Sequence, residues 1–249
     1  MATTAGNTVD PGEIAKFSAM ADEWWDHAGP FRPLHQMNPC RLAYVRDQVC
    51  AEMSRDPATM RALTGLRMLD VGCGGGLACE PLARMGADVT GIDAAAENIA
   101  VARVHAEETG LNIDYRETTA EALVEAGEQF DAVLALEVIE HVADPQSFLD
   151  ALGQLVRPGG LIILSTLNRT ARSYAVAILG AEYVLGWLPR GTHEWSRFLT
   201  PNQLDEHLER AGVEPVDRRG MRFDLLGGEW ALSADLSINY IATAVRPAS

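Results

Sequence analysis

The sequence predicts an α/β fold with a doubly wound, mostly parallel sheet and helices on both faces. Strand-like apolar runs alternate with helical stretches through residues 66–165, and such alternation predicts parallel strands joined by right-handed crossovers. The first run, 66–71, leads directly into a glycine-rich turn at 72–76, and the second run ends on Asp93. A chain of 249 residues is long enough for one large domain of this class.

The glycine turn and Asp93 together indicate a nucleoside-binding site of the Rossmann type. Glycines such as Gly72 and Gly74 allow positive φ and let the backbone approach a ligand closely, with the next helix N-terminus aimed at it. Asp93 stands 21 residues after Gly72, a spacing at which a carboxylate holds the hydroxyls of an adenosine ribose. A glycine-rich turn alone need not bind anything. Its combination with the preceding strand, the following helix and Asp93 favours a nucleoside-binding site.

The glycine spacing favours S-adenosylmethionine over a dinucleotide. The dinucleotide fingerprint has a third glycine where this chain has Leu77, and Glu80 follows in the first turns of the next helix. A carboxylate there would repel a pyrophosphate and suit a cationic ligand. S-adenosylmethionine carries a ribose, a sulfonium and an ammonium group, but no phosphate.

The other elements follow in chain order. Residues 1–11 are small and polar and are expected to be disordered. Apolar spacing predicts an amphipathic helix over 12–27, a break at 29–33 and a helix from about Pro39 to Met53. Further helices are expected at 75–85, 95–109, 145–156 and 201–211. Seven strands are expected, at 67–71, 87–92, 112–116, 130–136, 159–165, 213–218 and 238–246.

These elements form a single predicted domain over residues 1–249. Its parts are an N-terminal helical cap (12–56), a cofactor-binding core (66–165), an apolar lid or insert (170–200) and a C-terminal helix with closing strands (201–249).

The composition indicates which binding partners and which cellular compartment to expect. A formal net charge of −15 argues against electrostatic binding to nucleic acid. The four cysteines form no C-x-x-C pair and no signal peptide precedes them, which predicts a reduced, cytoplasmic protein.

Several blocks resemble the class I S-adenosylmethionine-dependent methyltransferases. They read LDVGCGGG at 69–76, TGID at 90–93, FDAVLALEVIEHV at 130–142 and LVRPGG at 155–160. Flanking blocks, among them EIAKF at 13–17, WWD at 24–26, PLH at 33–35, STLNR at 165–169, GAEY at 180–183 and PRGTH at 189–193, extend the likeness. Over nearly its whole length the chain is similar to the bacterial ubiquinone-biosynthesis O-methyltransferases. This resemblance implies methylation of ring hydroxyls on polyprenylated phenols, at two steps of the pathway.

The resemblance carries four cofactor positions onto Arg41, Gly72, Asp93 and Leu136. Arg41 offers a planar fork for the methionine carboxylate, although an arginine on an amphipathic helix is by default a solvated charge. Leu136 ends the fourth strand, where it would border the cofactor or serve as an ordinary core leucine. Many relatives have an acidic residue near the adenine after the third strand, where this chain reads TTAE at 118–121.

Candidate acceptor-side residues cluster at the end of the fourth strand, where open α/β sheets hold ligands. His141 is a suitable proton acceptor near neutral pH, and Glu140 is a second candidate catalytic residue. Glu137, Glu140 and His141 stand at i, i+3 and i+4, so one helical turn would present all three to a divalent cation such as Mg²⁺. The competing interpretation is that this block only ends the strand and lines the pocket, without metal.

The apolar segment 173–188 is too short to span a bilayer and is flanked by Arg169, Arg172 and Arg190. It would be either a lid that contacts the inner face of the cytoplasmic membrane or a helix buried against the sheet. The resemblance implies a polyprenylated phenol as the substrate, and a biosynthetic complex is the other expected partner. Alternative functions are methylation of another small phenol, NAD(P)-dependent oxidation, and cofactor binding without catalysis as a scaffold.

Overall fold

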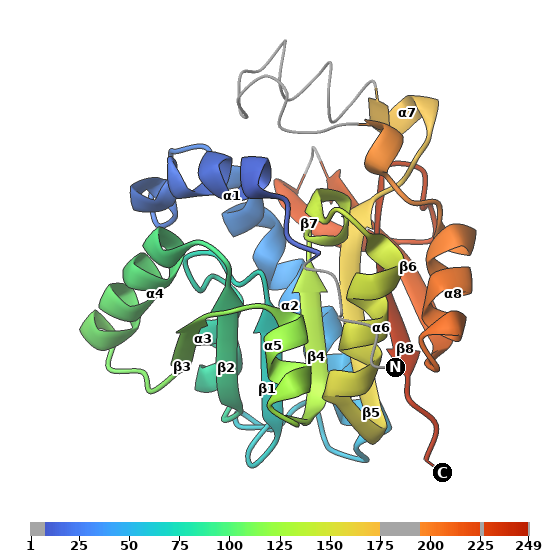
Figure 1. Cartoon of the computed structure of the whole chain (residues 1–249), viewed down its shortest axis with the longest axis horizontal. Coiled ribbons are helices and arrows are strands. Elements are labelled where there is room, and N and C mark those ends of the chain that lie inside the picture. Colours follow the sequence, from blue (N-terminus) through green and yellow to red (C-terminus); the bar gives the residue numbers. More distant parts are fainter. Residues whose placement is uncertain (1–7, 175–194, 225–226, 249) are drawn as a thin grey trace.

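The computed structural model describes residues 8–174, 195–224 and 227–248. Within them lies one sheet in the order β3-β2-β1-β4-β5-β8-β6-β7 (Figure 1). Strands β1 to β5 are parallel, whereas β8 runs antiparallel to both β5 and β6, and β7 runs antiparallel to β6. The strands are β1 (Arg67–Val71), β2 (Asp88–Asp93), β3 (Asp114–Glu117), β4 (Phe130–Leu136), β5 (Val156–Leu167), β6 (Glu214–Asp224), β7 (Glu229–Ser233) and β8 (Asn239–Val245).

The predicted α/β class and mostly parallel sheet are confirmed, but the described sheet has eight strands rather than seven. The missed strand is β7, which pairs only with β6 at the edge of the sheet. Its five residues are short for a strand prediction, and its pairing requires β6 to continue to Asp224, six residues beyond the predicted end at 218. Strand β5 is likewise longer than the predicted 159–165, because pairing begins at Val156 and the strand continues to Leu167.

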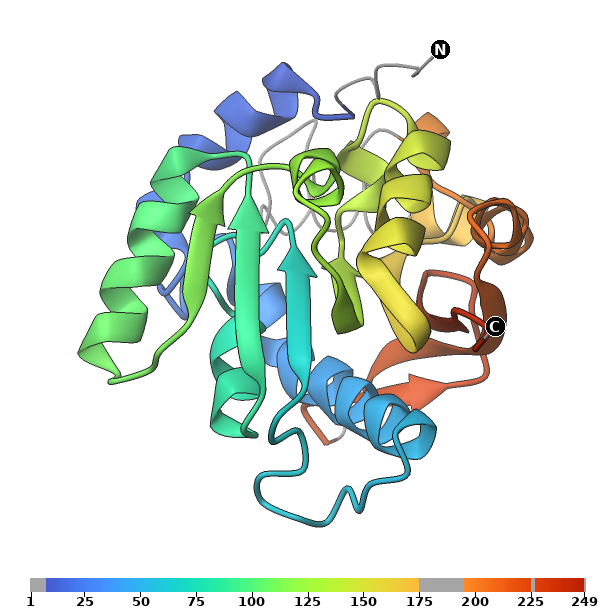
Figure 2. The ribbon, with the colours of Figure 1, turned by 60° about the horizontal axis from the view of Figure 1, so that its bottom comes forward.

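Helices cover both faces of the sheet (Figures 1 and 2). One apolar core joins α2, α3 and α4 to one face, and a second joins α5, α6 and α8 to the other. All residues of β4 except Leu136, and all residues of β5 from Gly160 onward, are buried, as expected for strands that are covered on both sides. The helices and short 3₁₀ turns are α1 (Pro11–Ser18), η1 (Ala21–Glu23), α2 (Arg32–Glu52), α3 (Cys79–Arg84), α4 (Ala96–Glu108), α5 (Ala120–Glu125), η2 (Ile139–His141), α6 (Pro145–Leu155), α7 (Ala171–Ser173), η4 (Trp195–Arg197) and α8 (Pro201–Arg210).

The N-terminal region differs most from prediction. The helix expected over 12–27 ends at Ser18, and after a short turn at 21–23 the chain packs Trp24 and Trp25 on the glycine turn. The helix expected from Pro39 begins at Arg32 and passes through Pro39, because buried side chains on both sides of the proline keep it against the core. Thr8, expected in a disordered tail, is buried and bonded to Glu121.

Most of the apolar segment 173–188 lies outside the described residues, so its lid and buried-helix interpretations both stay predictions. Helix α5 was missed because it is only six residues long, although Thr119 caps it in the usual way. Among the described residues, no helix is both long enough and apolar enough to cross a membrane.

Candidate active site

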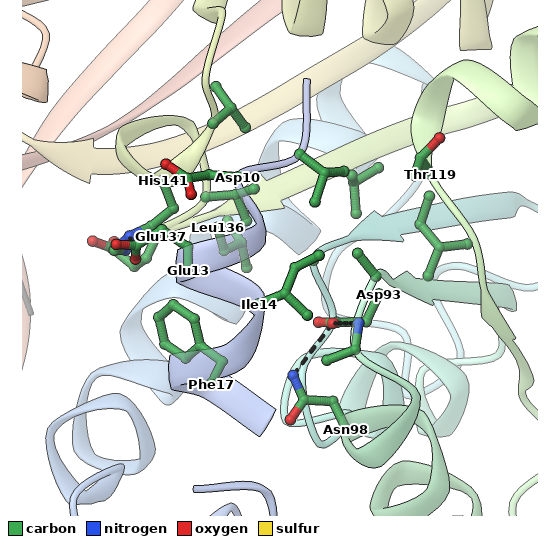
Figure 3. Close-up of a pocket in the computed structure, with 18 of the residues that line it drawn as sticks. Asp10, Glu13, Ile14, Phe17, Asp93, Asn98, Thr119, Leu136, Glu137 and His141 are labelled. Carbon is green, nitrogen blue, oxygen red and sulfur yellow. Dashed lines mark hydrogen bonds and ion pairs between the residues drawn. The ribbon is translucent and has the colours of Figure 1, made fainter. Parts of the chain in front are cut away.

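A cavity of about 260 Å³ opens at the carboxyl ends of the parallel strands, next to the point where β1 and β4 lie side by side. Neighbouring strands lead to crossovers in opposite directions at this point, and open α/β sheets hold their ligands there. The ends of β1, β2 and β4 line one side of the cavity, and α1 lines the other with Glu13, Ile14 and Phe17 (Figure 3).

The glycine turn after β1 forms part of the cavity wall. Gly72 and Gly74 have φ of 71° and 53°, values that favour glycine. A Cβ on Gly72 would lie 2.7 Å from the side chain of Val138, and one on Gly74 would lie 2.3 Å from the ring of Trp24. Gly72 lines the cavity, whereas Gly74 is covered by Trp24. The prediction that position 74 requires glycine is therefore consistent with the structure. The group that approaches its backbone, however, is the Trp24 ring rather than a ligand.

Asp93 ends β2 and lines the same cavity. Its Oδ2 accepts from the Gly74 N–H at 3.0 Å, and its Oδ1 accepts from the Ala95 N–H at 2.8 Å and from Asn98 Nδ2 at 3.3 Å. Burial raises the pKa of the Asp93 carboxyl, and these three donors oppose the shift. The arrangement presents a fixed carboxylate to the cavity.

Arg41 is buried behind the cavity wall rather than solvated. One of its terminal nitrogens donates to Asn38 Oδ1 at 2.9 Å, and the other lies 4.0 Å from Glu137 Oε1. Its Nε is buried without a hydrogen-bond partner. Arg41 does not line the cavity itself, but a buried unsatisfied donor is costly, and a ligand carboxylate that reached this atom would satisfy it. Leu136 ends β4 and borders the cavity.

The structure does not bring Glu137, Glu140 and His141 together as a metal site. Glu137, at a φ of 58°, accepts from Ser165 Oγ at 2.6 Å, whereas Glu140 Oε2 accepts from Thr166 Oγ1 at 2.8 Å. His141 Nδ1 contacts Glu13 Oε2 at 2.7 Å. Among the residues that the structure describes, no group of three His, Cys, Asp or Glu side chains is arranged to hold a metal ion. The short 3₁₀ turn does not present i, i+3 and i+4 on one face as an α-helical turn would.

The two candidate catalytic residues therefore have different positions. His141 and Glu137 line the cavity, while Glu140 is buried beside β5 and does not. Burial, with the nearby Glu137 charge, raises the pKa of Glu140 to about 7. The catalytic role of Glu140 stays a prediction, and the geometry favours His141.

Glu80 does not face the cavity, contrary to its interpretation as a partner for a cationic cofactor. It is buried, and it pairs with His105 Nδ1 at 2.5 Å and with Arg84 at 3.4 Å. The side chain of an early helical residue can point away from the ligand, and sequence spacing alone does not reveal this direction.

Sequence reasoning missed several lining residues, among them Thr8, Glu13 and Asn98, and it noted the stretch at 118–121 without assigning Glu121 to the site. Glu121 Oε1 accepts from the N–H and hydroxyl of Thr8, while its Oε2 is buried without a partner. The signal available for Glu121 was its position after the third strand. For Thr8 and Glu13 there was none, because their contacts lie 113 and 128 residues away along the chain.

Comparison with known proteins gives consistent results. A family model described as a methyltransferase domain matches residues 42–217. A ubiquinone biosynthesis O-methyltransferase of Ruegeria pomeroyi is 61% identical over 97% of this chain and 98% of its own length. The protein of the same name from Dinoroseobacter shibae is 60% identical over 99% of this chain and 100% of its own. Among solved structures, the magnesium protoporphyrin IX methyltransferase of Synechocystis with bound S-adenosylmethionine shares the fold, with a TM-score of 0.62 and 19% identity over 96% of this chain and 99% of its own.

Proposed function

The chain belongs to the methyltransferase-domain family and, within it, to the ubiquinone biosynthesis O-methyltransferases, and from this membership we propose which residues hold the cofactor and the acceptor. The protein is an S-adenosylmethionine-dependent O-methyltransferase that acts on ring hydroxyls of polyprenylated phenols in ubiquinone biosynthesis. The observation that carries the site assignment is the Asp93 carboxylate, fixed by backbone N–H groups at the mouth of the glycine turn.

On the cofactor side, Asp93 would receive the ribose hydroxyls and Arg41 the methionine carboxylate. The buried, unpartnered Nε of Arg41 supports this, because a carboxylate would satisfy it. Glu121 would accept from the amino group of the adenine, since its Oε2 is unpartnered in the cavity wall beyond Asp93. The cofactor supplies an electrophilic methyl group on sulfur, and the protein has to align it and exclude water.

On the acceptor side, His141 would take the proton from the phenol. The Glu13 carboxylate accepts from Nδ1, which makes Nε2 the basic nitrogen of the neutral ring. That hydrogen bond also lowers the pKa of Glu13, which keeps its carboxylate ionised. Because the predicted metal ligands point to different partners, no step of this proposal uses a metal ion.

The function is tested by incubating the purified protein with methyl-labelled S-adenosylmethionine and a panel of short-tailed and tail-less catechols. We expect label in the phenolic ether, and more of it with the prenylated acceptors. Transfer to small phenols alone would favour the alternative acceptor class. Cofactor binding with no transfer to any acceptor would favour a scaffold, and tight NAD(P)H binding would favour an oxidoreductase.

We also propose that the apolar segment 173–188 contacts the membrane that dissolves the substrate. Tyr174 and Trp195 stand at the two junctions with the undescribed residues 175–194, with their rings edge to face at 6.4 Å and both partly exposed. Amphipathic aromatic rings favour the membrane–water interface. Replacing Ile178 and Leu185 with Glu should reduce sedimentation with anionic liposomes and activity on long-tailed acceptors. Unchanged sedimentation of a folded variant would exclude this segment as the membrane contact.

A further inference from the structure

The tryptophan pair at 24–25 has no role in the cofactor contacts proposed above. Trp24 is buried, and its ring stacks on that of Phe31 with 3.8 Å between centroids and 6° between planes. Its other side covers Gly74 and Gly75, where an added Cβ would lie 2.3 Å and 2.5 Å from it. Trp24 is therefore held in one position against the turn that borders Asp93.

Trp24 connects to Asp93 through one intervening side chain. Its Nε1 donates to Asn98 Oδ1 at 2.8 Å, and Asn98 Nδ2 donates to Asp93 Oδ1 at 3.3 Å (Figure 3 shows the second contact). An indole N–H can only donate, so Trp24 requires the amide oxygen of Asn98 to face it. The amide nitrogen then faces the carboxylate, which can only accept while it is ionised.

Asn98 is placed to transmit this constraint. It lies in the first turn of α4, is 2% exposed and lines the cavity. Without Trp24, the amide could rotate about its last torsion and present its oxygen to Asp93, which would repel the carboxylate. The three side chains form a directed chain of hydrogen bonds from the N-terminal segment to the cavity.

We propose that Trp24 is a positioning residue for cofactor binding, which acts through Asn98 to hold the Asp93 carboxylate in the orientation that receives the ribose hydroxyls. This inference rests on the proposed contact between Asp93 and the ribose. It gives the first tryptophan of the pair a role that its packing alone would not require, because packing on the glycine turn would support every cofactor contact equally.

The experiment compares two ligands by calorimetry: S-adenosylhomocysteine and its analogue that lacks both ribose hydroxyls. We expect the wild type to prefer the hydroxylated ligand. Trp24→Phe keeps an aromatic ring but removes the N–H, and it should reduce that preference about 2- to 10-fold, the range for one lost hydrogen bond. Affinity for the analogue should stay within about twofold, because the analogue makes no contact that the chain of hydrogen bonds supports.

Two further variants complete the design. Asn98→Ala leaves the Trp24 ring in place and should reduce the preference as Trp24→Phe does, and the double variant should show no additional loss. Trp25→Phe is the matched control, because it removes the indole N–H that donates to Gly75 O at 3.0 Å on the same segment without touching Asn98. It should leave the preference unchanged.

The outcomes separate the hypotheses. Equal weakening of both ligands by Trp24→Phe means that Trp24 only supports the turn, and it overturns the proposal. A preference that falls in Asn98→Ala but not in Trp24→Phe overturns it as well. If the wild type itself shows no preference, the Asp93–ribose assignment fails first and the positioning role fails with it. Circular dichroism of each variant checks that the fold is retained.

Discussion

The two sides of the cavity are built by different means. On the cofactor side, the backbone N–H groups of Gly74 and Ala95 hold Asp93, and the Asn98 amide, itself bonded to Trp24, adds one side-chain donor. On the acceptor side, the polar residues are held by side chains of other elements. Ser165 and Thr166 of β5 hold Glu137 and Glu140 at 2.6 and 2.8 Å, and Glu13 of α1 holds His141 at 2.7 Å.

This difference predicts that cofactor binding and catalytic turnover depend on different residues. The two backbone donors keep the Asp93 carboxylate beside the cavity when α1 moves, so that the Trp24–Asn98 link affects only its orientation. A histidine whose tautomer depends on α1 is set correctly only while α1 is docked. We therefore expect substitutions on the cofactor side to change affinity and those on the acceptor side to change turnover.

The largest expected effect comes from Gly74→Val. The backbone there has a φ of 53°, and the new side chain would occupy the space of the Trp24 ring, so cofactor binding should be lost. Calorimetry with S-adenosylhomocysteine measures it. Gly110→Val is the matched control, because its φ is 68° but no atom lies within 4 Å of its Cβ position. Tight binding by a folded Gly74→Val variant would show that the turn does not support the site.

The next effect is on turnover. His141→Ala should lower kcat by about 10²- to 10⁴-fold, the usual contribution of a general base, with little change in cofactor affinity. Glu13→Gln should lower kcat less, because the glutamine keeps the contact but not the charge. Steady-state kinetics with a saturating short-tailed catechol provide the comparison. A kcat within twofold of wild type for His141→Ala would leave the histidine as a wall residue only.

Asp93→Ala should weaken cofactor binding rather than slow turnover. Loss of charge-assisted hydrogen bonds to the ribose costs about 1.5–3 kcal/mol, roughly a tenfold to hundredfold weaker Kd. The kcat at saturating cofactor should change much less. If calorimetry finds the dissociation constant unchanged, the backbone-held carboxylate is not part of the cofactor site.

The smallest effect concerns Asp70, beneath the glycine turn. Burial raises its pKa to about 6 from an ordinary value of 3.8. A raised folded pKa means that folding is favoured at low pH and that this advantage is lost as pH rises towards and through 6. Asp70→Asn removes the buried charge, so its stability relative to wild type should be greater at pH 8 than at pH 5, by about 1 kcal/mol. Urea unfolding at the two pH values measures this difference. If the difference in stability between Asp70→Asn and the wild type is the same at both pH values, burial does not raise the pKa of Asp70.

The difference between the cofactor side and the acceptor side also explains which parts of the site the sequence could predict. The glycine turn and Asp93 were found because strand, turn and carboxylate follow one another within about one βαβ unit, and local spacing sets their geometry. The predicted trio at 137–141 failed as a cluster because a 3₁₀ turn replaced the expected helical turn and β5 provided two hydroxyl partners. Glu13 and Thr8 could not be assigned to the site, since nothing near them in the sequence indicates their distant partners. The helix at 12–27 was predicted too long because packing of the tryptophans on the turn overrides helical periodicity.

The position of β8 has a consequence for how the molecule is made. This strand, residues 239–245, lies between β5 and β6 and is hydrogen-bonded to both. A chain emerging from the ribosome can assemble its parallel half first, but the hairpin of β6 and β7 has no place in the sheet until residue 245 is available. A nascent chain stalled before Asn239 would therefore expose the edge of β5 over residues 161–167, which β8 otherwise covers, and would present an open strand to chaperones or to other nascent chains.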